Sequence, residues 1–291
     1  MLNALLKDSI EAPRETSWRK KPSKNYKTGR KPKYDTQNRL LFLLEWLSAP
    51  STNDRQEFEN SYAKSSCQED KKHILKAINE VLKDEVKWPS AEERQEHYQS
   101  YNGIFTGVVG ILDIWEHYYK KSKDPDEERR TFSGKANTNT KKTIGIIDKK
   151  GYFIYYKTNL DGRPNDRETW TSSELYMDAG KFFSDGERVA ADGGFQGDGP
   201  QVISFSKVDD QDKALYNVAF KEVRIGIENA FGRVQMWFPI LGVNLAYWKH
   251  DSELLELAVG AAIKLHNWML RHRELEYDAQ NNPRNWYRDM Y

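Results

Sequence analysis

The sequence predicts an α/β protein in which helices flank a mixed sheet and a helical segment precedes it. Three observations support this fold class. Residues 36–88 carry apolar side chains at helical spacing, residues 103–207 hold short apolar runs between turn residues, and residues 210–275 return to long helical patterns. With 291 residues, 38% of them hydrophobic, the chain is long enough for one large domain and a smaller one.

The N-terminal region predicts a basic arm followed by a helical module. We expect residues 1–35 to form a disordered arm, because residues 18–33 hold eight Lys or Arg and no acid. Such an arm could contact phosphates, carry a nuclear-import signal or be a solvated linker. Residues 36–102 predict three short helices and a connector, typical of a helix-turn-helix-like module. A small three-helix unit of this kind either binds DNA or only packs.

The next region predicts a sheet. Residues 103–117 form an apolar run with Asp113 embedded in it, and residues 141–160 read as two strands around a hairpin turn. Residues 165–183 predict a helix, "ERVAADGG" a fourth strand and residues 201–207 a short fifth. Long helices over 210–238 and 252–275 follow, with Gly226 and Gly232 as weak points in the first, before a tail at 276–291. This order predicts an RNase H-like domain over residues 103–275.

Three carboxylates occupy informative places in that order. Asp113 lies on the first strand, Asp192 ends the fourth, and Glu228 lies on the following helix. Because the first and fourth strands are neighbours in an RNase H-like sheet, these side chains should converge at one edge. Carboxylate oxygens suit Mg²⁺ or Mn²⁺, and two such ions can activate a water or a 3′-hydroxyl for attack on a phosphodiester. The sequence therefore favours a two-metal site.

Each acid also has a structural interpretation. Asp192 could simply open a Gly-rich turn, Glu228 could pair with Arg224 one turn earlier, and Asp166 could be a helix cap or first-turn acid. Asp113 could be a hydrogen-bonded structural residue, although a lone buried carboxylate is costly. Among other polar and aromatic side chains, we expect His266 to be a buried structural histidine. Trp170 could stack on an unpaired base, but packing is its expected role.

Several function classes are excluded. The chain has a single cysteine, Cys67, so neither an intrachain disulfide nor a multi-cysteine zinc site can form. No apolar run approaches the roughly 20 residues of a membrane span, and the N-terminus is unlike a signal peptide. The sequence lacks the spacing of an EF-hand loop and the Gly-x-Ser-x-Gly elbow of hydrolases. We expect a soluble intracellular protein, located in the nucleus with a share in the cytoplasm.

Five short motifs occur in order: "LDIWEH", "GRPNDRETW", "ADGGF", "RIGIENAFGRVQMWFPIL" and "KLHNW". With "FSGK" at 132–135, they resemble the blocks of PIF/Harbinger-type DDE transposases and of nucleases domesticated from them, over about residues 105–270. The resemblance implies a metal site at Asp113, Asp166, Asp192 and Glu228, with Asp113, Asp192 and Glu228 as the catalytic set. The chain departs from the family pattern at Ile114-Trp115, Asn165 and Gln235.

The resemblance implies an enzyme that cleaves DNA at transposon ends and joins the 3′-hydroxyls to target DNA. A domesticated nuclease or DNA-binding factor of the same fold is the alternative, and a non-enzymatic interaction protein is a third. The implied partners are DNA, a separate Myb-like DNA-binding protein and a second copy of the chain on DNA, with no membrane. The candidate DNA contacts are Arg224, Arg233, Lys135, Lys141 and Lys142, and in the arm Arg19, Lys20, Lys21, Arg30 and Lys31.

Overall fold

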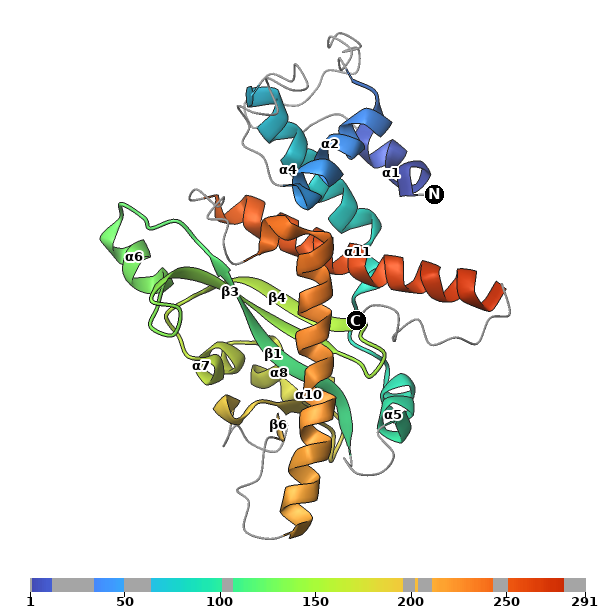
Figure 1. Ribbon diagram of the computed structural model, residues 1–291, viewed down its shortest axis with the longest axis vertical. Coiled ribbons are helices and arrows are strands. Elements are labelled where there is room, and N and C mark those ends of the chain that lie inside the picture. Colours follow the sequence, from blue (N-terminus) through green and yellow to red (C-terminus); the bar gives the residue numbers. More distant parts are fainter. Residues whose placement is uncertain are drawn as a thin grey trace.

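The computed structural model describes residues 2–11, 34–49, 64–100, 107–195, 202–203, 211–242 and 251–279. Helices lie on both faces of a sheet, and a group of N-terminal helices packs at one end of the molecule (Figure 1). The long helix α11 lies between the N-terminal helices and the sheet. No helix within the described ranges is long and apolar enough to cross a membrane.

The sheet has the mixed topology that the sequence predicts. Its central strands run in the order β3-β1-β5-β6, and both β2 and β4 pair with β3. β3 is antiparallel to β1 and β4, whereas β5 is parallel to β1 and β6. The arrangement is consistent with an RNase H-like fold. The strands are β1 (Val108–Tyr118), β2 (Phe132–Ser133), β3 (Thr138–Ile147), β4 (Phe153–Asp161), β5 (Arg188–Ala191) and β6 (Val202–Ile203).

Alternate side chains of β1 enter two different cores, because successive residues of a strand point to opposite faces. Leu112 packs with Trp170 and Leu175 on the face covered by the short helices α7 (Asp166–Thr171), α8 (Glu174–Met177) and α9 (Ala179–Phe182). Trp115 packs into the other core, which contains the long helices α10 (Gln211–Trp237) and α11 (Ser252–Ala279). Asp113 lies two residues before Trp115 on the same strand, so its side chain points to the same face of the sheet, which α10 covers.

A glycine of β3 allows α10 to approach the sheet closely. A Cβ atom on Gly145 of β3 would lie 2.7 Å from the Phe231 ring of α10, so the close packing requires a glycine there. Gly226 of α10 faces Ile111 and Ile147, whose side chains would be 3.5 and 3.6 Å from an added Cβ atom. The sequence treats Gly226 as a weak point, but α10 continues unbroken through it because the helix is held against the sheet.

The N-terminal helices share one hydrophobic core with α10 and α11. Lys264 of α11 donates to the Asn79 carbonyl over 2.7 Å, and the Asn79 side chain donates to the Leu257 carbonyl over 2.9 Å. Arg39 and Asp70 form a buried ion pair of 2.6 Å within the helical group. Through these contacts the N-terminal helices pack against α11 and against one another. These helices are α1 (Leu2–Glu11), α2 (Thr36–Ser48), α4 (Lys64–Val81), the short η1 (Lys83–Glu85) and α5 (Ala91–Ser100).

The structure differs from the elements predicted from the sequence in three places. Residues 2–11, assigned to the arm, form α1 and bury Leu6 and Ile10. The single helix expected over 165–183 is divided into α7, α8 and α9, because Ser173 caps a new helix by accepting from the Tyr176 amide. A further short helix, α6 (Pro125–Thr131), begins at its cap Asp124. The basic run at 18–33 lies outside the described residues.

Candidate active site

Asp113 of β1 and Asp192, which directly follows β5, lie side by side at neighbouring parallel strands. Leu112 of β1 pairs with Ala191, the last residue of β5. Asp113 is the next residue of β1, and Asp192 is the residue directly after β5. Asp113 Oδ1 accepts the Ile114 N–H over 2.8 Å, and Asp192 Oδ1 accepts the Gly193 N–H over 2.7 Å. The backbone therefore fixes the position of both carboxylates at the edge of the α10 face.

The surroundings of Asp113 disfavour its negative charge. The pKa of Asp113 is raised to about 6, chiefly by burial, and the Asp166 and Asp192 carboxylates act in the same direction. The Ile114 N–H and the Arg224 guanidinium act in the opposite direction. Asp166 from α7 and Asp192 from the end of β5 thus lie close enough to act on Asp113, as expected of a site that receives a cation.

Arg224 connects Glu228 to this cluster. Its Nη2 lies 2.8 Å from Glu228 Oε1, one turn later on α10, and its Nη1 lies 3.7 Å from Asp192 Oδ2. The helical pair proposed from the sequence is therefore present, and it brings Glu228 to the same edge as Asp192. The Glu228 and Asp192 side chains are about half exposed, at 47% and 50%.

Asp166 is not the cap of α7. The cap is Asn165, whose side chain accepts the Glu168 N–H over 2.8 Å while the Glu168 carboxylate accepts the Asn165 N–H over 3.0 Å. The Asp166 carboxylate instead meets two ammonium groups, with Lys142 at 3.3 Å and Lys135 at 3.5 Å. Asp166 is therefore the first-turn acid of α7 and part of the acidic cluster.

Lys141 and Lys142 are internal, which corrects their assignment as phosphate contacts. Lys142 is only 2% exposed, and its Nζ donates to the Pro164 carbonyl over 2.5 Å and lies 3.5 Å from Glu116 Oε1. Lys141 is also buried and pairs with Asp161 at 2.9 Å. Lys142 thus joins β1, β3 and the start of α7, and it sets the position of Asp166.

Arg224, predicted to contact DNA, has its guanidinium beside Glu228 and Asp192. The other DNA-contact candidates divide into three groups. The Lys135 side chain is 75% exposed beside Asp166, so it can meet a phosphate. Arg233 lies about 140° around α10 from Glu228, because each residue turns an α-helix by about 100°, and its charge acts on His266 instead. The arm residues 19–21, 30 and 31 lie outside the described residues.

Other side chains that the sequence singled out are structural. Trp170 is fully buried, which leaves no face for a DNA base. His266 is buried as expected, with Nε2 3.0 Å from the Gly151 carbonyl oxygen. Trp115 packs against Phe231 with ring centroids 5.2 Å apart, so it fills the core rather than the site.

Asn267 has a structural role that the sequence did not indicate. Its Oδ1 accepts the Phe153 N–H over 2.9 Å, and its Nδ2 donates to the Phe153 and Glu85 carbonyls over 2.8 and 2.7 Å. One side chain therefore joins α11 to the start of β4 and to η1. The polar pair His266-Asn267 within an apolar helix was the available signal.

The acidic cluster has the donor chemistry of a divalent-metal site. In the described part of the chain, no three His, Cys, Asp or Glu side chains are already arranged around a common metal position. The four acids nevertheless offer the hard oxygen donors that Mg²⁺ and Mn²⁺ prefer. Arg224 supplies positive charge between two of them, and the repulsion acting on Asp113 would be relieved by a cation.

Comparison with protein families identifies the domain. The model described as DDE superfamily endonuclease matches residues 112–267, which are 156 of the 291 residues. The chain belongs to the DDE superfamily endonuclease family. Searches of curated proteins and of solved structures return no match. The match to this DDE endonuclease family begins one residue before Asp113 and ends at Asn267, so it includes all four acids, and family members generally use divalent metals.

Proposed function

We propose that this chain is a metal-dependent DNA endonuclease whose catalytic carboxylates are Asp113, Asp192 and Glu228. The observation that carries the proposal is the adjacency of Asp113 and Asp192 on β1 and β5, with Arg224 joining Asp192 to Glu228. Two rigid strands and one helix thus contribute acids to one edge of the sheet. Asp166 is proposed as a fourth metal ligand, because its charge also acts on Asp113.

The four acids would hold Mg²⁺ or Mn²⁺, which supplies activation of a water or 3′-hydroxyl and stabilisation of the leaving oxygen in phosphodiester cleavage. The chain's own residues supply rigidity and charge balance. Backbone N–H groups orient Asp113 and Asp192, and buried Lys142 holds Asp166. The exposed ammonium of Lys135 can contact a DNA phosphate beside Asp166.

The finer proposal is a PIF/Harbinger-type transposase that cleaves transposon ends and joins 3′-hydroxyls to target DNA. The ordered motifs from "LDIWEH" to "KLHNW" support it. With this subtype we propose a nuclear location, two copies of the chain on DNA and a Myb-like DNA-binding protein as partner. A domesticated nuclease without strand transfer is the second candidate, favoured by the departures at Ile114-Trp115 and Gln235 from the family pattern.

Metal-dependent nicking of supercoiled plasmid tests the endonuclease. We expect purified wild-type protein to nick in Mg²⁺ or Mn²⁺ and not in EDTA, and we expect Asp192→Asn and Glu228→Gln to fall to background. Asp185→Asn, in the exposed loop before β5, and Glu256→Gln, on the exposed side of α11, are matched controls that should nick like wild type.

The outcomes separate the candidates. Nicking by Asp192→Asn or Glu228→Gln at the wild-type rate would contradict the proposed site. If the site is supported, a strand-transfer assay with pre-cleaved ends distinguishes the two finer proposals. Joining of the ends to target plasmid supports a transposase, whereas nicking without joining supports a domesticated nuclease.

A further inference from the structure

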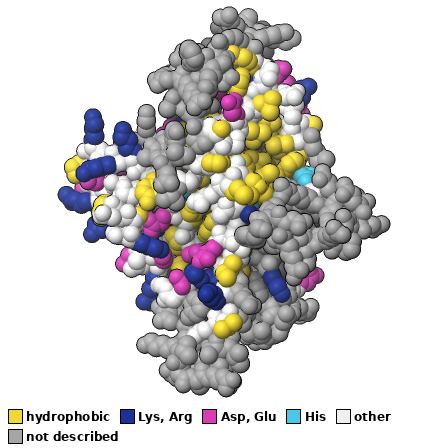
Figure 2. Space-filling view, in the orientation of Figure 1, with side chains coloured by type: hydrophobic (Ala, Val, Ile, Leu, Met, Phe, Trp, Pro, Cys, Tyr) yellow, Lys and Arg dark blue, Asp and Glu magenta, His cyan; other side chains and the backbone are white. Residues whose placement is uncertain are grey.

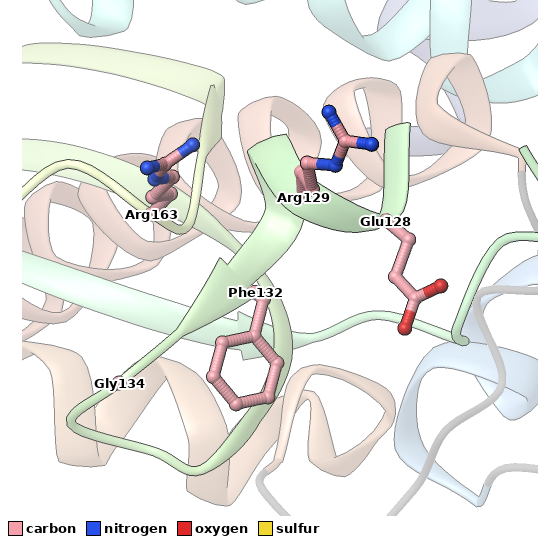
Figure 3. Close-up of a pocket in the computed structure, with 5 residues that line it drawn as sticks. All are labelled: Glu128, Arg129, Phe132, Gly134 and Arg163. Carbon is pink, nitrogen blue, oxygen red and sulfur yellow. The ribbon is translucent and has the colours of Figure 1, made fainter. Parts of the chain in front are cut away.

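A surface recess lies beside the acidic cluster and contains none of its residues. It has a volume of about 490 Å³ and is lined by Glu128, Arg129, Phe132, Gly134 and Arg163 (Figure 3). These side chains come from α6, from β2 and its following turn, and from the loop after β4. The volume is within the roughly 300–1,000 Å³ of sites that hold small organic molecules.

Phe132 gives the recess an accessible aromatic ring. Phe132 is 42% exposed, which makes it the most exposed of the Phe, Tyr and Trp residues whose exposure the structure describes. A Cβ atom on the neighbouring Gly134 would meet nothing within 4 Å, so the space beside the ring is open. An exposed aromatic next to a glycine turn can accept a flat ligand on its face.

The recess is also positively charged. Figure 2 shows Lys and Arg side chains gathered at the edge of the molecule that α6 occupies. Glu128 is paired with Lys121 at 2.6 Å, and Arg129 has only a distant, exposed partner, Asp126, at 3.7 Å. Within the described ranges, no acid lies at ion-pair distance from Arg163. The lining therefore offers two guanidinium groups for anionic oxygens.

The backbone around the recess is fixed rather than loose. The Asn139 side chain donates to the Glu128 carbonyl over 3.0 Å and to Thr131 Oγ1 over 2.8 Å, which joins α6 to β3. The Arg163 amide donates to the Arg130 carbonyl over 3.0 Å. Because both walls are tied together, the separation between the backbone segments that carry Phe132, Arg129 and Arg163 is set before any ligand arrives.

The recess and the acidic cluster are connected by short stretches of chain. Arg163 lies three residues before Asp166, and Lys135, three residues after Phe132, reaches within 3.5 Å of Asp166. A DNA strand that places a phosphate at the cluster would therefore pass the recess within a short length of chain. The chemistry that fits a cationic rim around an aromatic face is a nucleotide, with a flat base and a phosphate on either side.

We propose that this recess, the Phe132 recess, binds an unpaired nucleotide of the DNA beside the cleavage site. The base stacks on the Phe132 ring while Arg129 and Arg163 contact the flanking phosphates. The inference rests on the proposed endonuclease function, because it assumes that DNA lies across the acidic cluster. It assigns the stacking role to Phe132 in place of the buried Trp170.

Equilibrium binding without cleavage tests this inference. Fluorescence anisotropy in EDTA would compare a labelled duplex that ends in a short single-stranded extension with a blunt duplex of equal phosphate number. We expect wild type to prefer the extended duplex and Phe132→Ala to lose about 5- to 100-fold in affinity for it, with less than about twofold change for the blunt duplex. Phe132→Tyr, which keeps the ring, should bind like wild type.

A second variant and a spectroscopic signal make the outcome decisive. Arg163→Gln should weaken binding of the extended duplex and reduce its salt dependence. A 2-aminopurine base in the extension should be quenched by wild type and by Phe132→Tyr but not by Phe132→Ala. Equal affinity of wild type and Phe132→Ala for the extended duplex would overturn the proposal and favour a protein contact at this surface. Binding as expected without plasmid nicking would overturn only the endonuclease function.

Discussion

Asp113 of β1 and Asp192, directly after β5, lie at equivalent places beside each other, each one residue beyond the paired Leu112 and Ala191. Their spacing is therefore set by the sheet, in which neighbouring strands lie about 4.8 Å apart. The Asp192 carboxylate adds to the burial that raises the pKa of Asp113, because two nearby negative charges repel each other. The repulsion is the physical reason to expect that a cation binds here.

Asp113→Asn tests whether this repulsion costs stability. The amide keeps an oxygen for the Ile114 N–H but removes a mostly buried charge that faces Asp166 and Asp192. We expect the free energy of unfolding in EDTA at neutral pH to rise by about 1–2 kcal/mol and nicking to disappear. Urea denaturation and the plasmid assay measure the two effects. A less stable variant would show that Asp113 is a structural residue.

Arg224→Gln tests whether the guanidinium competes with metal. Arg224 places its charge between Asp192 and Glu228, where a divalent ion would be held by the same oxygens. Without that charge we expect Mn²⁺ to bind about fivefold more tightly, measured from the free-Mn²⁺ spin-resonance signal during titration.

A matched control for Arg224 is Lys83→Gln, which removes an exposed pair with Glu80 on the N-terminal helices. It should leave Mn²⁺ affinity unchanged. Weaker Mn²⁺ binding by Arg224→Gln would contradict competition and would instead identify Arg224 as a residue that positions Glu228.

Lys142→Met tests the buried ammonium behind Asp166. The substitution keeps the length of the side chain but leaves Asp166 and Glu116 without their shared cation. We expect the free energy of unfolding to fall by about 2 kcal/mol, since the partly buried Glu116 and Asp166 carboxylates and the Pro164 carbonyl lose a shared donor. Urea denaturation of Lys142→Met beside Lys135→Gln, an exposed partner of the same acid, gives the comparison. A loss as small as that of Lys135→Gln would mean that Lys142 contributes little to the site.

The adjacency of the first two acids could be predicted from the sequence because it depends on strand order alone. The apolar runs and the hairpin turn define the strands, and pairing of the first with the fourth places Asp113 beside Asp192. The link to Glu228 was also within reach, since Arg224 and Glu228 are one helical turn apart. In both cases the decisive spacing is local or follows from a single rule of topology.

The buried lysines could not be predicted in this way. In "TNTKKTIGII" two adjacent lysines read as solvent-exposed, because lysine is rarely buried without a partner. The partners are Glu116 on the neighbouring strand and Asp161 and Asp166 further along the chain, and only the folded sheet brings them together. The exposure of Phe132 was equally hidden, because it depends on how α6 and its turn project from the sheet.

His266 leads to a prediction about pH. It is buried against the Phe153 and Trp237 rings, its Nε2 meets the Gly151 carbonyl, and the Arg233 charge acts on it. Burial lowers the pKa of His266 from 6.5 to about 4. Between these values the unfolded chain binds a proton that the folded chain does not, so stability is present above pH 6.5 and is lost as the pH falls.

For this one histidine we expect the loss to approach about 1.4 kcal/mol per pH unit below pH 6.5 and to total about 3 kcal/mol near pH 4. His266→Gln can still donate to the Gly151 carbonyl but cannot titrate. The slope of its unfolding free energy against pH should therefore be smaller than that of the wild type, by the amount that corresponds to about one proton taken up on unfolding. Urea denaturation at several values between pH 7 and pH 4.5 measures both slopes, and the carboxylates common to both proteins cancel in the difference. Equal slopes would mean that His266 is protonated in the folded chain, with a positive charge accommodated beside Arg233.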